Sequence, residues 1–254
     1  RNEDGSWYEN LSKFEYENPV ALLTEADGDV KNTQLRYNAG ITYNPIRDLT
    51  LQANYSYNRF VMNRGYSETL NHISARRDGY KGWSSVGSSI SVEKLLELTA
   101  QYDASIGRNK FTILGGYSYN ENNYENIWVD NWGFQDDYFG GWHNIGIGSA
   151  LKDGKANVGS SKSLTNLIGF FGRATYSYDN KYLLMAALRY EGASQLWGTD
   201  NAWGLFPSVS LGWRITQEKF MQDQNIFDDL KLRVGYGVTG SQPRASFLGV
   251  AMLR

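Results

Sequence analysis

Apolar and polar side chains alternate along several stretches of this chain. The clearest stretch runs from Leu49 to Asn58, where Leu, Leu, Ala, Tyr and Tyr take the odd positions and Thr, Gln, Asn, Ser and Asn take the even ones. Successive side chains of a β-strand point to opposite faces of the sheet, so this stretch forms one apolar and one polar face. Strands of about ten residues with this alternation, joined by alternately short turns and long polar loops, are typical of a membrane-spanning β-barrel.

The pattern predicts about eight antiparallel strands. They are expected over residues 35–43, 49–58, 93–106, 111–119, 167–178, 182–190, 205–214 and 230–238. Every second connection is short. The long connections, at residues 64–90, 121–163, 191–203 and after 240, are therefore predicted to be extracellular loops, and the short turns periplasmic.

Other segments depart from the alternation. The charged, turn-rich start of the chain, to about Lys31, is predicted to be a surface loop. Residues 217–229 lose the two-residue rhythm and predict a short helix that carries Phe220, Met221 and Phe227, with Thr216 as its cap. Residues 247–254 read as the start of a further element, so we expect the chain to be a piece of a longer protein.

In the last predicted strand, Lys231 and Arg233 lie on the face opposite Leu232 and Val234. We expect that charged face to look into a wet lumen.

Composition at first argues against a membrane, because mean hydropathy is -0.51 and 20% of residues are charged. No stretch approaches the roughly 18 consecutive apolar residues of a transmembrane helix, which excludes helical spans. A barrel passes this test because only every second residue of a strand meets lipid. The 18 Tyr and 8 Trp favour the barrel, since these side chains settle at the boundary between lipid and water.

Charge and cysteine content exclude several classes of site and partner. A net charge of -2 provides no field to attract nucleic acid. The absence of cysteine excludes a disulfide scaffold, a thiolate metal site and a cysteine nucleophile. The run from Gly235 to Gly240 has the spacing of a dinucleotide fingerprint, but no helical pattern follows it, so we interpret its glycines as strand residues and expect no cofactor.

Metal and catalytic sites have no positive support. His72 and His143 lie in different predicted loops without a partner at ligand spacing, and both are expected to be solvated. Four residues of one loop offer oxygen ligands for calcium but follow no ordered pattern, and we favour a hydrated loop; they are Asp130, Asn131, Asp136 and Asp137. No Ser, His and Asp constellation is apparent, so we predict that the protein is not an enzyme.

The long loops are rich in aromatic side chains, and loops of this length tend to be functional. Tryptophans there either stack on sugars or peptide side chains or hold the loops down, and we expect packing for most of them. The candidate substrate contacts are Trp128, Trp132, Trp142, Trp197 and Trp203.

One region carries a family resemblance. The run from Phe170 to Tyr178, followed by Lys181-Tyr182-Leu183-Leu184, resembles the SusC/RagA family of TonB-dependent outer-membrane transporters of Bacteroidetes. The likeness continues through residues 203–215, 218–221 and 230–242 and is specific over about 165–243. Glu191-Gly192-Ala193-Ser194-Gln195 departs from the family's usual Asp-Gly-Ser-Ser-Arg run, which puts any loop contact of that Arg in doubt.

The resemblance implies a protein of the bacterial outer membrane, with a 22-stranded barrel and an N-terminal plug. It implies TonB-dependent import of oligosaccharides or peptides together with a SusD-like surface lipoprotein. On this basis residues 1–254 form one arc of a single barrel domain in contact with outer-membrane lipid, while the plug and the closing strands lie elsewhere in the protein.

Three alternatives stay open. A small, self-closed barrel of about eight strands would serve adhesion or structure, and would need the first and last strands to pair. An outer-membrane enzyme would need a catalytic group at the barrel rim. A soluble β-sandwich is disfavoured by the regular alternation of short and long connections.

Overall fold

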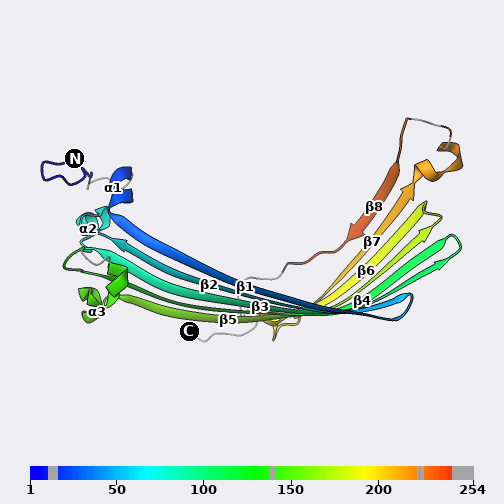
Figure 1. Cartoon of the computed structure of the whole chain (residues 1–254), viewed down its shortest axis with the longest axis horizontal. Coiled ribbons are helices and arrows are strands. Elements are labelled where there is room, and N and C mark those ends of the chain that lie inside the picture. Colours follow the sequence, from blue (N-terminus) through cyan, green and yellow to red (C-terminus); the bar gives the residue numbers. More distant parts are fainter. Residues whose placement is uncertain (11–16, 138–140, 222, 224–225, 242–254) are drawn as a thin grey trace. The chain divides into compact units, whose positions relative to one another are not determined.

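A computed structural model describes residues 1–10, 17–137, 141–221, 223 and 226–241. Most of them lie in one antiparallel sheet of eight strands that follow one another in chain order (Figure 1). The strands are β1 (Ala26–Ile46), β2 (Leu49–Glu68), β3 (Trp83–Ile106), β4 (Asn109–Trp132), β5 (Asn157–Tyr178), β6 (Tyr182–Ala193), β7 (Trp203–Arg214) and β8 (Lys231–Gly237). The eight predicted strands are therefore confirmed.

Several strands are longer than the alternation predicted. The first five contain 20 to 24 residues each. The predicted loops at 64–90 and 121–163 shrink to residues 69–82 and 133–156, and β1 already begins at Ala26, within the predicted initial loop. The segments by which these strands exceed the prediction carry polar side chains on both faces. Backbone pairing therefore continues beyond the residues in which apolar and polar side chains alternate. The predicted loop after residue 240 lies mostly outside the described residues, as does the element expected at 247–254.

The helices are short. They are α1 (Pro19–Thr24), α2 (Ile73–Asp78), α3 (Ser149–Lys152) and the 3-10 helices η1 (Gly141–Ile147), η2 (Ser194–Leu196), η3 (Ile215–Gln217) and η4 (Lys219–Met221). Among the described residues, no helix has the length and apolar character needed to cross a membrane.

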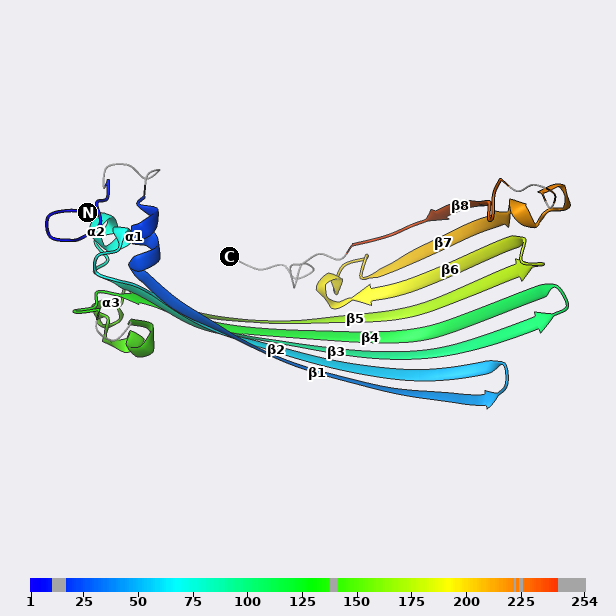
Figure 2. The ribbon, with the colours of Figure 1, turned by 45° about the horizontal axis from the view of Figure 1, so that its top comes forward.

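The chain divides into two compact units. Unit 1 contains residues 1–35, 59–91 and 123–163; unit 2 contains residues 36–58, 92–122 and 164–254. In unit 1, α2 and α3 lie on opposite sides of the strand ends (Figures 1 and 2). Nearly all buried apolar side chains belong to this unit, among them Ala21, Ile73, Phe134 and Ala150.

Unit 2 has one apolar and one polar face. The register places Tyr176, Leu184, Leu211 and Val234 in one row across β5 to β8, and the next row contains Ser177, Leu183, Gly212 and Arg233. Because neighbouring rows point to opposite faces, the first row belongs to the apolar face and the second to the polar face. Leu211 and Val234 are 58% and 64% exposed. The predicted position of Arg233 opposite the apolar residues is confirmed.

Aromatic side chains border the apolar face of unit 2 at two levels. Tyr178 stacks on Tyr182 at one level, with ring centroids 6.4 Å apart, and Tyr190 stacks on Trp203 at the other, at 4.7 Å. Tyr182 and Tyr190 are eight residues apart in β6, which corresponds to about 26 Å along a strand. That length is comparable with the apolar band of outer-membrane barrels, flanked on both sides by aromatic girdles.

The prediction of one short helix over residues 217–229 is wrong. Its residues instead make the 3-10 helices η3 and η4, and Phe227 lies beyond both; residues 222, 224 and 225 are outside the described part. Thr216 is not a cap, because it lies inside η3 and its hydroxyl donates to Asp229 Oδ1 at 3.1 Å.

Glu218 stabilises the end of unit 2 that contains the turn between β5 and β6. Its carboxylate accepts hydrogen bonds from the hydroxyl of Tyr182 at 2.6 Å and the indole N–H of Trp213 at 3.1 Å, and it pairs with Lys181 Nζ at 3.4 Å. The hydroxyl of Tyr182, with smaller contributions from Trp213 and Lys181, holds the pKa of Glu218 below its usual range. One carboxylate thus links the turn between β5 and β6 to the end of β7.

The order of the strands contradicts the alternative of a small, self-closed barrel. Such a barrel needs β1 beside β8, whereas these strands are the two ends of the order. Of the three glycines in the fingerprint-like run, Gly235 and Gly237 lie in β8, as predicted, whereas Gly240 lies beyond the end of that strand.

Candidate functional site

The structure sorts the five candidate tryptophans into three environments. Trp128 and Trp142 line a pocket in unit 1, while Trp197 and Trp203 line a pocket in unit 2. Trp132 lines neither and packs edge-on against Tyr80, with ring centroids 5.4 Å apart. Trp128 and Trp132 lie in β4 and Trp203 begins β7, so these three are not loop residues, which corrects their predicted placement.

The unit 1 pocket has a volume of about 380 Å³. Residues of β1 to β4 form its floor and η1 supplies Trp142 at its edge. Polar groups border it: Lys31 and Arg64 bring positive charge, Asp29 brings negative charge, and Ser88 Oγ donates to Asn63 Oδ1 at 2.9 Å.

Glycines allow both indoles to lie against the strands. A Cβ on Gly65 would come within 2.0 Å of Trp142 Cε3, and one on Gly159 within 2.1 Å of Trp128 Cζ2. The backbone N–H of Trp142 donates to Ser67 Oγ at 2.9 Å, which fixes the start of η1 on β2. The indole Nε1 of Trp142 is buried without a hydrogen-bond partner among the described residues.

This arrangement suits recognition of a polar organic solute. Flat indole surface combined with amide, hydroxyl and charged groups is the usual composition of pockets that bind small ligands. Aromatic faces pack against the apolar faces of sugars and against peptide side chains, while the border groups supply hydrogen bonds.

The unit 2 pocket has a different setting. It measures about 300 Å³, and Trp203 lies against Gly192, where a Cβ would come within 2.7 Å of the indole. Trp203 lies on the apolar face, where its ring stacks on Tyr190 and lies near Phe170, with a centroid distance of 6.4 Å to the latter. Trp197 is 73% exposed. Trp203 therefore belongs to the aromatic border of the apolar face, whereas Trp197 follows η2 as an exposed residue of the connection between β6 and β7.

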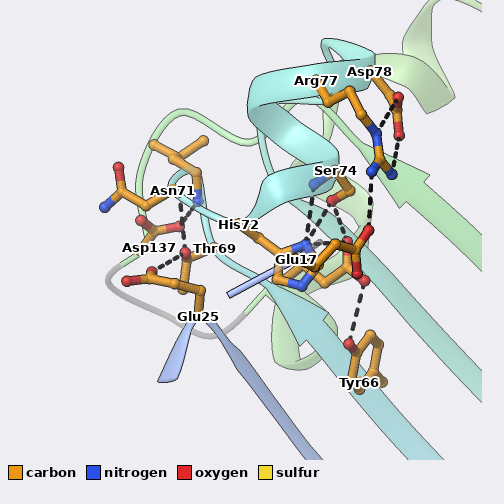
Figure 3. A network of polar contacts seen from close by, with 12 residues as sticks. Glu17, Glu25, Tyr66, Thr69, Asn71, His72, Ser74, Arg77, Asp78 and Asp137 are labelled. Atoms are coloured by element: carbon orange, nitrogen blue, oxygen red, sulfur yellow. Dashed lines mark hydrogen bonds and ion pairs between the residues drawn. The ribbon is translucent and has the colours of Figure 1, made fainter. Parts of the chain in front are cut away.

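A buried polar cluster in unit 1 was missed by sequence reasoning (Figure 3). His72 is only 7% exposed, so its prediction as a solvated residue is wrong. Its Nδ1 lies 2.9 Å from Ser74 Oγ and 3.2 Å from a carboxylate oxygen of Glu68, and Ser74 Oγ also donates to Glu68. His72 caps α2 by accepting from Ser74 N, a role usually taken by Ser, Thr, Asp or Asn and therefore not signalled by this sequence.

Further contacts tie the same cluster to distant parts of unit 1. Arg77 pairs with Glu17 at 2.9 Å, and Thr69 Oγ1 donates to Glu25 at 2.5 Å. Asp137 accepts from the backbone N–H of Leu70 at 2.9 Å, and burial, with the nearby Glu25 and Asp136, raises the pKa of Asp137. His143, in contrast, is exposed as predicted.

The four residues considered for calcium serve separate purposes. Asn131 is completely buried and bonds to the carbonyls of Ile145 and Gly148 at 2.7 and 3.1 Å and to the N–H of Leu151 at 2.9 Å. Asp130 accepts from Asn157 at 3.0 Å. In the part of the chain that the structure describes, no three His, Cys, Asp or Glu side chains gather as metal ligands. Asn131 is instead the structural centre of the segment that includes η1 and α3.

A family comparison accounts for the two-faced sheet. The family model described as "TonB dependent receptor-like, beta-barrel" matches residues 2–250. The chain belongs to this family. It is thus a segment of a bacterial outer-membrane β-barrel, and its apolar face is the one that meets lipid.

Relatives of this TonB-dependent receptor segment occur in Bacteroidetes. It is 29% identical to TonB-dependent receptor P26 of Formosa agariphila over 95% of this chain and 24% of that protein. It is 34% identical to TonB-dependent receptor SusC of Bacteroides thetaiotaomicron over 65% of this chain and 15% of that protein. The chain therefore spans a quarter or less of these two relatives.

Solved structures share the fold of this receptor segment. The RagAB peptide transporter matches with a TM-score of 0.74 at 22% identity, over 87% of this chain and 24% of the matched chain. The RagAB peptide importer in its open-open state matches with a TM-score of 0.73 at 21% identity, over 92% and 26%. The predicted SusC/RagA resemblance is confirmed, and the family consists of receptors and transporters and not of enzymes.

Proposed function

We propose that this chain is part of the barrel wall of a transporter that imports oligosaccharides or peptides across the outer membrane with energy from TonB. The observation that carries the proposal is the sheet of unit 2, whose apolar face bears aromatic borders while its other face is charged, within a match to the TonB-dependent receptor barrel. Transport needs such a wall, because the wet face lines a passage while the other meets lipid.

The rest of the protein must complete this wall. β1 and β8 end the sheet order, and open strand edges are not tolerated in lipid because their backbone groups would be unpaired. We propose that residues 1–254 belong to a single barrel domain, that the closing strands and a plug lie outside them, and that a SusD-like lipoprotein covers the extracellular side. The names of SusC and RagAB support this assembly.

Within this function, Trp128 and Trp142 are the proposed substrate contacts. Their pocket combines indole surface with polar border groups, whereas Trp203 borders the apolar face, Trp197 is exposed and Trp132 packs on Tyr80. The substrate would be a sugar or peptide because both offer apolar patches next to hydrogen-bonding groups.

Uptake by cells that carry the full-length protein tests the proposal. The probes are a size-fractionated panel of labelled neutral and acidic oligosaccharides and a panel of labelled peptides. We expect uptake of members of one panel, abolished when the membrane is de-energised. Uptake of neither panel by energised cells with correctly assembled protein would contradict the proposal.

A tryptophan variant tests the pocket separately. Trp142→Ala is expected to weaken binding of the imported probe to the purified protein about 2- to 12-fold, the equivalent of one aromatic contact of about 0.5–1.5 kcal/mol. Trp197→Ala, in the unit 2 pocket, is the matched control and should leave binding unchanged. Equal loss in both variants, or in neither, would remove the unit 1 pocket from substrate recognition.

A further inference from the structure

The apolar face of unit 2 contains a hollow of about 450 Å³ over β4, β5 and β6. Its floor is made of Gly172, Ala174 and Ala186, and the two alanines pair directly across β5 and β6. A Cβ on Gly172 would meet nothing nearer than a backbone oxygen at 3.7 Å. Arg173 also borders the hollow, but it alternates with Gly172 and Ala174 along β5, so its side chain belongs to the polar face. Larger apolar side chains surround the floor: Ile113, Phe170, Leu188 and Tyr190.

The hollow occupies only one half of the apolar band. Ala186 lies four residues from Tyr182 and four from Tyr190, which mark the two aromatic levels. The hollow extends from Ala186 toward Tyr190, whereas toward Tyr182 the same face carries bulky side chains such as Leu184 and Leu211. Its depth is therefore that of a single leaflet, since one leaflet fills half of the hydrocarbon thickness.

At the aromatic level the hollow continues into the pocket of unit 2 that Trp203 lines. The ring of Trp203 stacks on Tyr190 at 4.7 Å and lies 6.4 Å from Phe170, and both of these rings border the hollow. The pocket adds an amide, a phenol hydroxyl and a second, exposed indole, those of Asn166, Tyr119 and Trp197. Hollow and pocket form one amphipathic groove, with an apolar end at mid-depth and a polar, aromatic end beyond the border.

The polar end of the amphipathic groove is electrically neutral. None of the described residues that line its pocket is charged. The nearby Lys94 is paired with Glu121 at 2.8 Å, and Tyr119 donates to the same carboxylate at 3.2 Å. A phosphate head group would therefore find no uncompensated cation among the described lining residues. Hydroxyl, amide and indole groups instead match the hydroxyls and apolar faces of a sugar.

We infer that the amphipathic groove binds one glycolipid molecule of the surrounding leaflet, with an acyl chain in the hollow and a sugar of the head group against Trp197 and Trp203. The groove continues the lipid-facing surface across its aromatic border. Contact with bulk lipid needs only an apolar surface, whereas an amide and two indoles directly beyond a hollow of one-leaflet depth select the head group as well. The inference rests on the proposed function in one respect: the connection between β6 and β7 is taken as extracellular, which makes this the outer leaflet.

Photolabelling in lipid nanodiscs tests this inference. The full-length protein is placed in phospholipid discs that contain a trace of an acylated glucosamine disaccharide without phosphates, which carries a diazirine in one acyl chain. A phospholipid with the same diazirine chain is the reference, and its label on the apolar face shows that the protein is inserted. We expect the glycolipid label to concentrate on residues 170–174 and 186–190 and to be removed by excess unlabelled glycolipid. The phospholipid label should be diffuse and resist that competition.

Two pairs of variants test the two ends of the groove. Ala186→Leu fills the hollow and should abolish the competed label, whereas Ala100→Leu adds the same side chain at an exposed position of β3 outside the groove and should not. Trp197→Ala should weaken competition by the glycolipid about 2- to 12-fold, as expected for the loss of one aromatic contact. Phe220→Ala, which removes an exposed aromatic ring in η4, is its control and should have no effect.

Three results would overturn the inference. Equal labelling by glycolipid and phospholipid, without competition, would mean contact with bulk lipid only. Competition by the free disaccharide as strong as that by the glycolipid would assign the polar end to a soluble sugar. A smaller oligomer of Ala186→Leu in light scattering, with unchanged glycolipid label, would assign the hollow to a second copy of the protein. Labelling in discs does not require import, so failure of the proposed transport and failure of this inference are observed separately.

Discussion

Unit 1 and unit 2 share strands β1 to β5 but are stabilised in different ways. Unit 1 surrounds a small interior of its own, where Ile73 and Phe134 are buried together with polar residues such as His72 and Asn131. Among its described residues, unit 2 has few buried side chains, such as those of Ser118 and Ala193, and instead exposes a row of apolar residues, including Leu211 and Val234. The buried interior of unit 1 is typical of a domain in water. The exposed apolar row of unit 2 is typical of a sheet that is surrounded by lipid.

The largest effect should come from placing a charge on the lipid face. Val209→Arg is expected to destabilise the full-length barrel by about 2–4 kcal/mol, because Val209 pairs with Ala186, midway between the aromatic levels of Tyr182 and Tyr190, and a cation at the depth of the bilayer centre loses its hydration. Ser208→Arg, on the opposite face of the same strand, carries the same charge into the wet side and should cost far less. Urea unfolding of the protein refolded into bilayers measures both; equal losses would mean that the two faces are wrongly assigned.

The second effect concerns the interior of unit 1. Asn131→Ala removes a completely buried amide and takes this partner from two carbonyls and from the N–H groups of Trp132 and Leu151, which should cost about 2–4 kcal/mol locally. We expect faster hydrogen exchange over residues 141–152, with no change in β6 and β7. Asn157→Ala, which removes one exposed bond to Asp130, is the control and should have little effect. Exchange that rises across both units would show that they do not open separately.

This difference also explains what the sequence could predict. In unit 2, side chains such as those of Leu49–Asn58 alternate because one face meets lipid, so strand positions and the polar face were visible in the pattern. In unit 1 the strand ends are polar on both sides, and burial depends on loops that fold back over them. The extensions of β2 and β4 and the burial of His72 therefore escaped detection, since only the three-dimensional packing creates them.

The candidate site shows the same limit. Tryptophan content marked the residues to consider, but Trp142 reaches its pocket because Gly65 leaves room on a neighbouring strand, and Trp203 belongs to the aromatic border. No local pattern distinguishes these two positions.

A third prediction concerns Gly65, which lies against Trp142. Gly65→Ala places a methyl group where Trp142 lies and should displace the indole, at a cost of about 1–3 kcal/mol and with weaker substrate binding. Gly115→Ala in β4 of unit 2 is the matched control, because nothing lies within 4 Å of its added Cβ. Urea unfolding and probe binding measure the two variants. Unchanged binding in Gly65→Ala would show that Trp142 does not need this position to contact substrate.

The smallest effect, a response to pH, should have opposite signs in the two units. The pKa of Glu218 is lowered by Tyr182, so its contribution to the turn of unit 2 is present above the ordinary glutamate pKa and is lost as pH falls through the folded value. The pKa of Asp137 is raised by burial, so its contribution in unit 1 is fully present below the ordinary aspartate pKa and is lost as pH rises through the folded value.

Acidification from neutral pH should therefore loosen the Glu218 contacts and not the Asp137 contact. Hydrogen exchange of residues 181–183 and 213–218, corrected for the intrinsic pH dependence of exchange, is expected to quicken as pH falls, while that of residues 69–71 is not. Because an amide does not titrate, Glu218→Gln should abolish the pH dependence of exchange at residues 181–183 and 213–218. Asp137→Asn should likewise abolish any pH dependence of exchange at residues 69–71. If residues 69–71 loosened in acid together with the Glu218 turn, the burial of Asp137 would not govern its titration, and the two units would respond to pH as one.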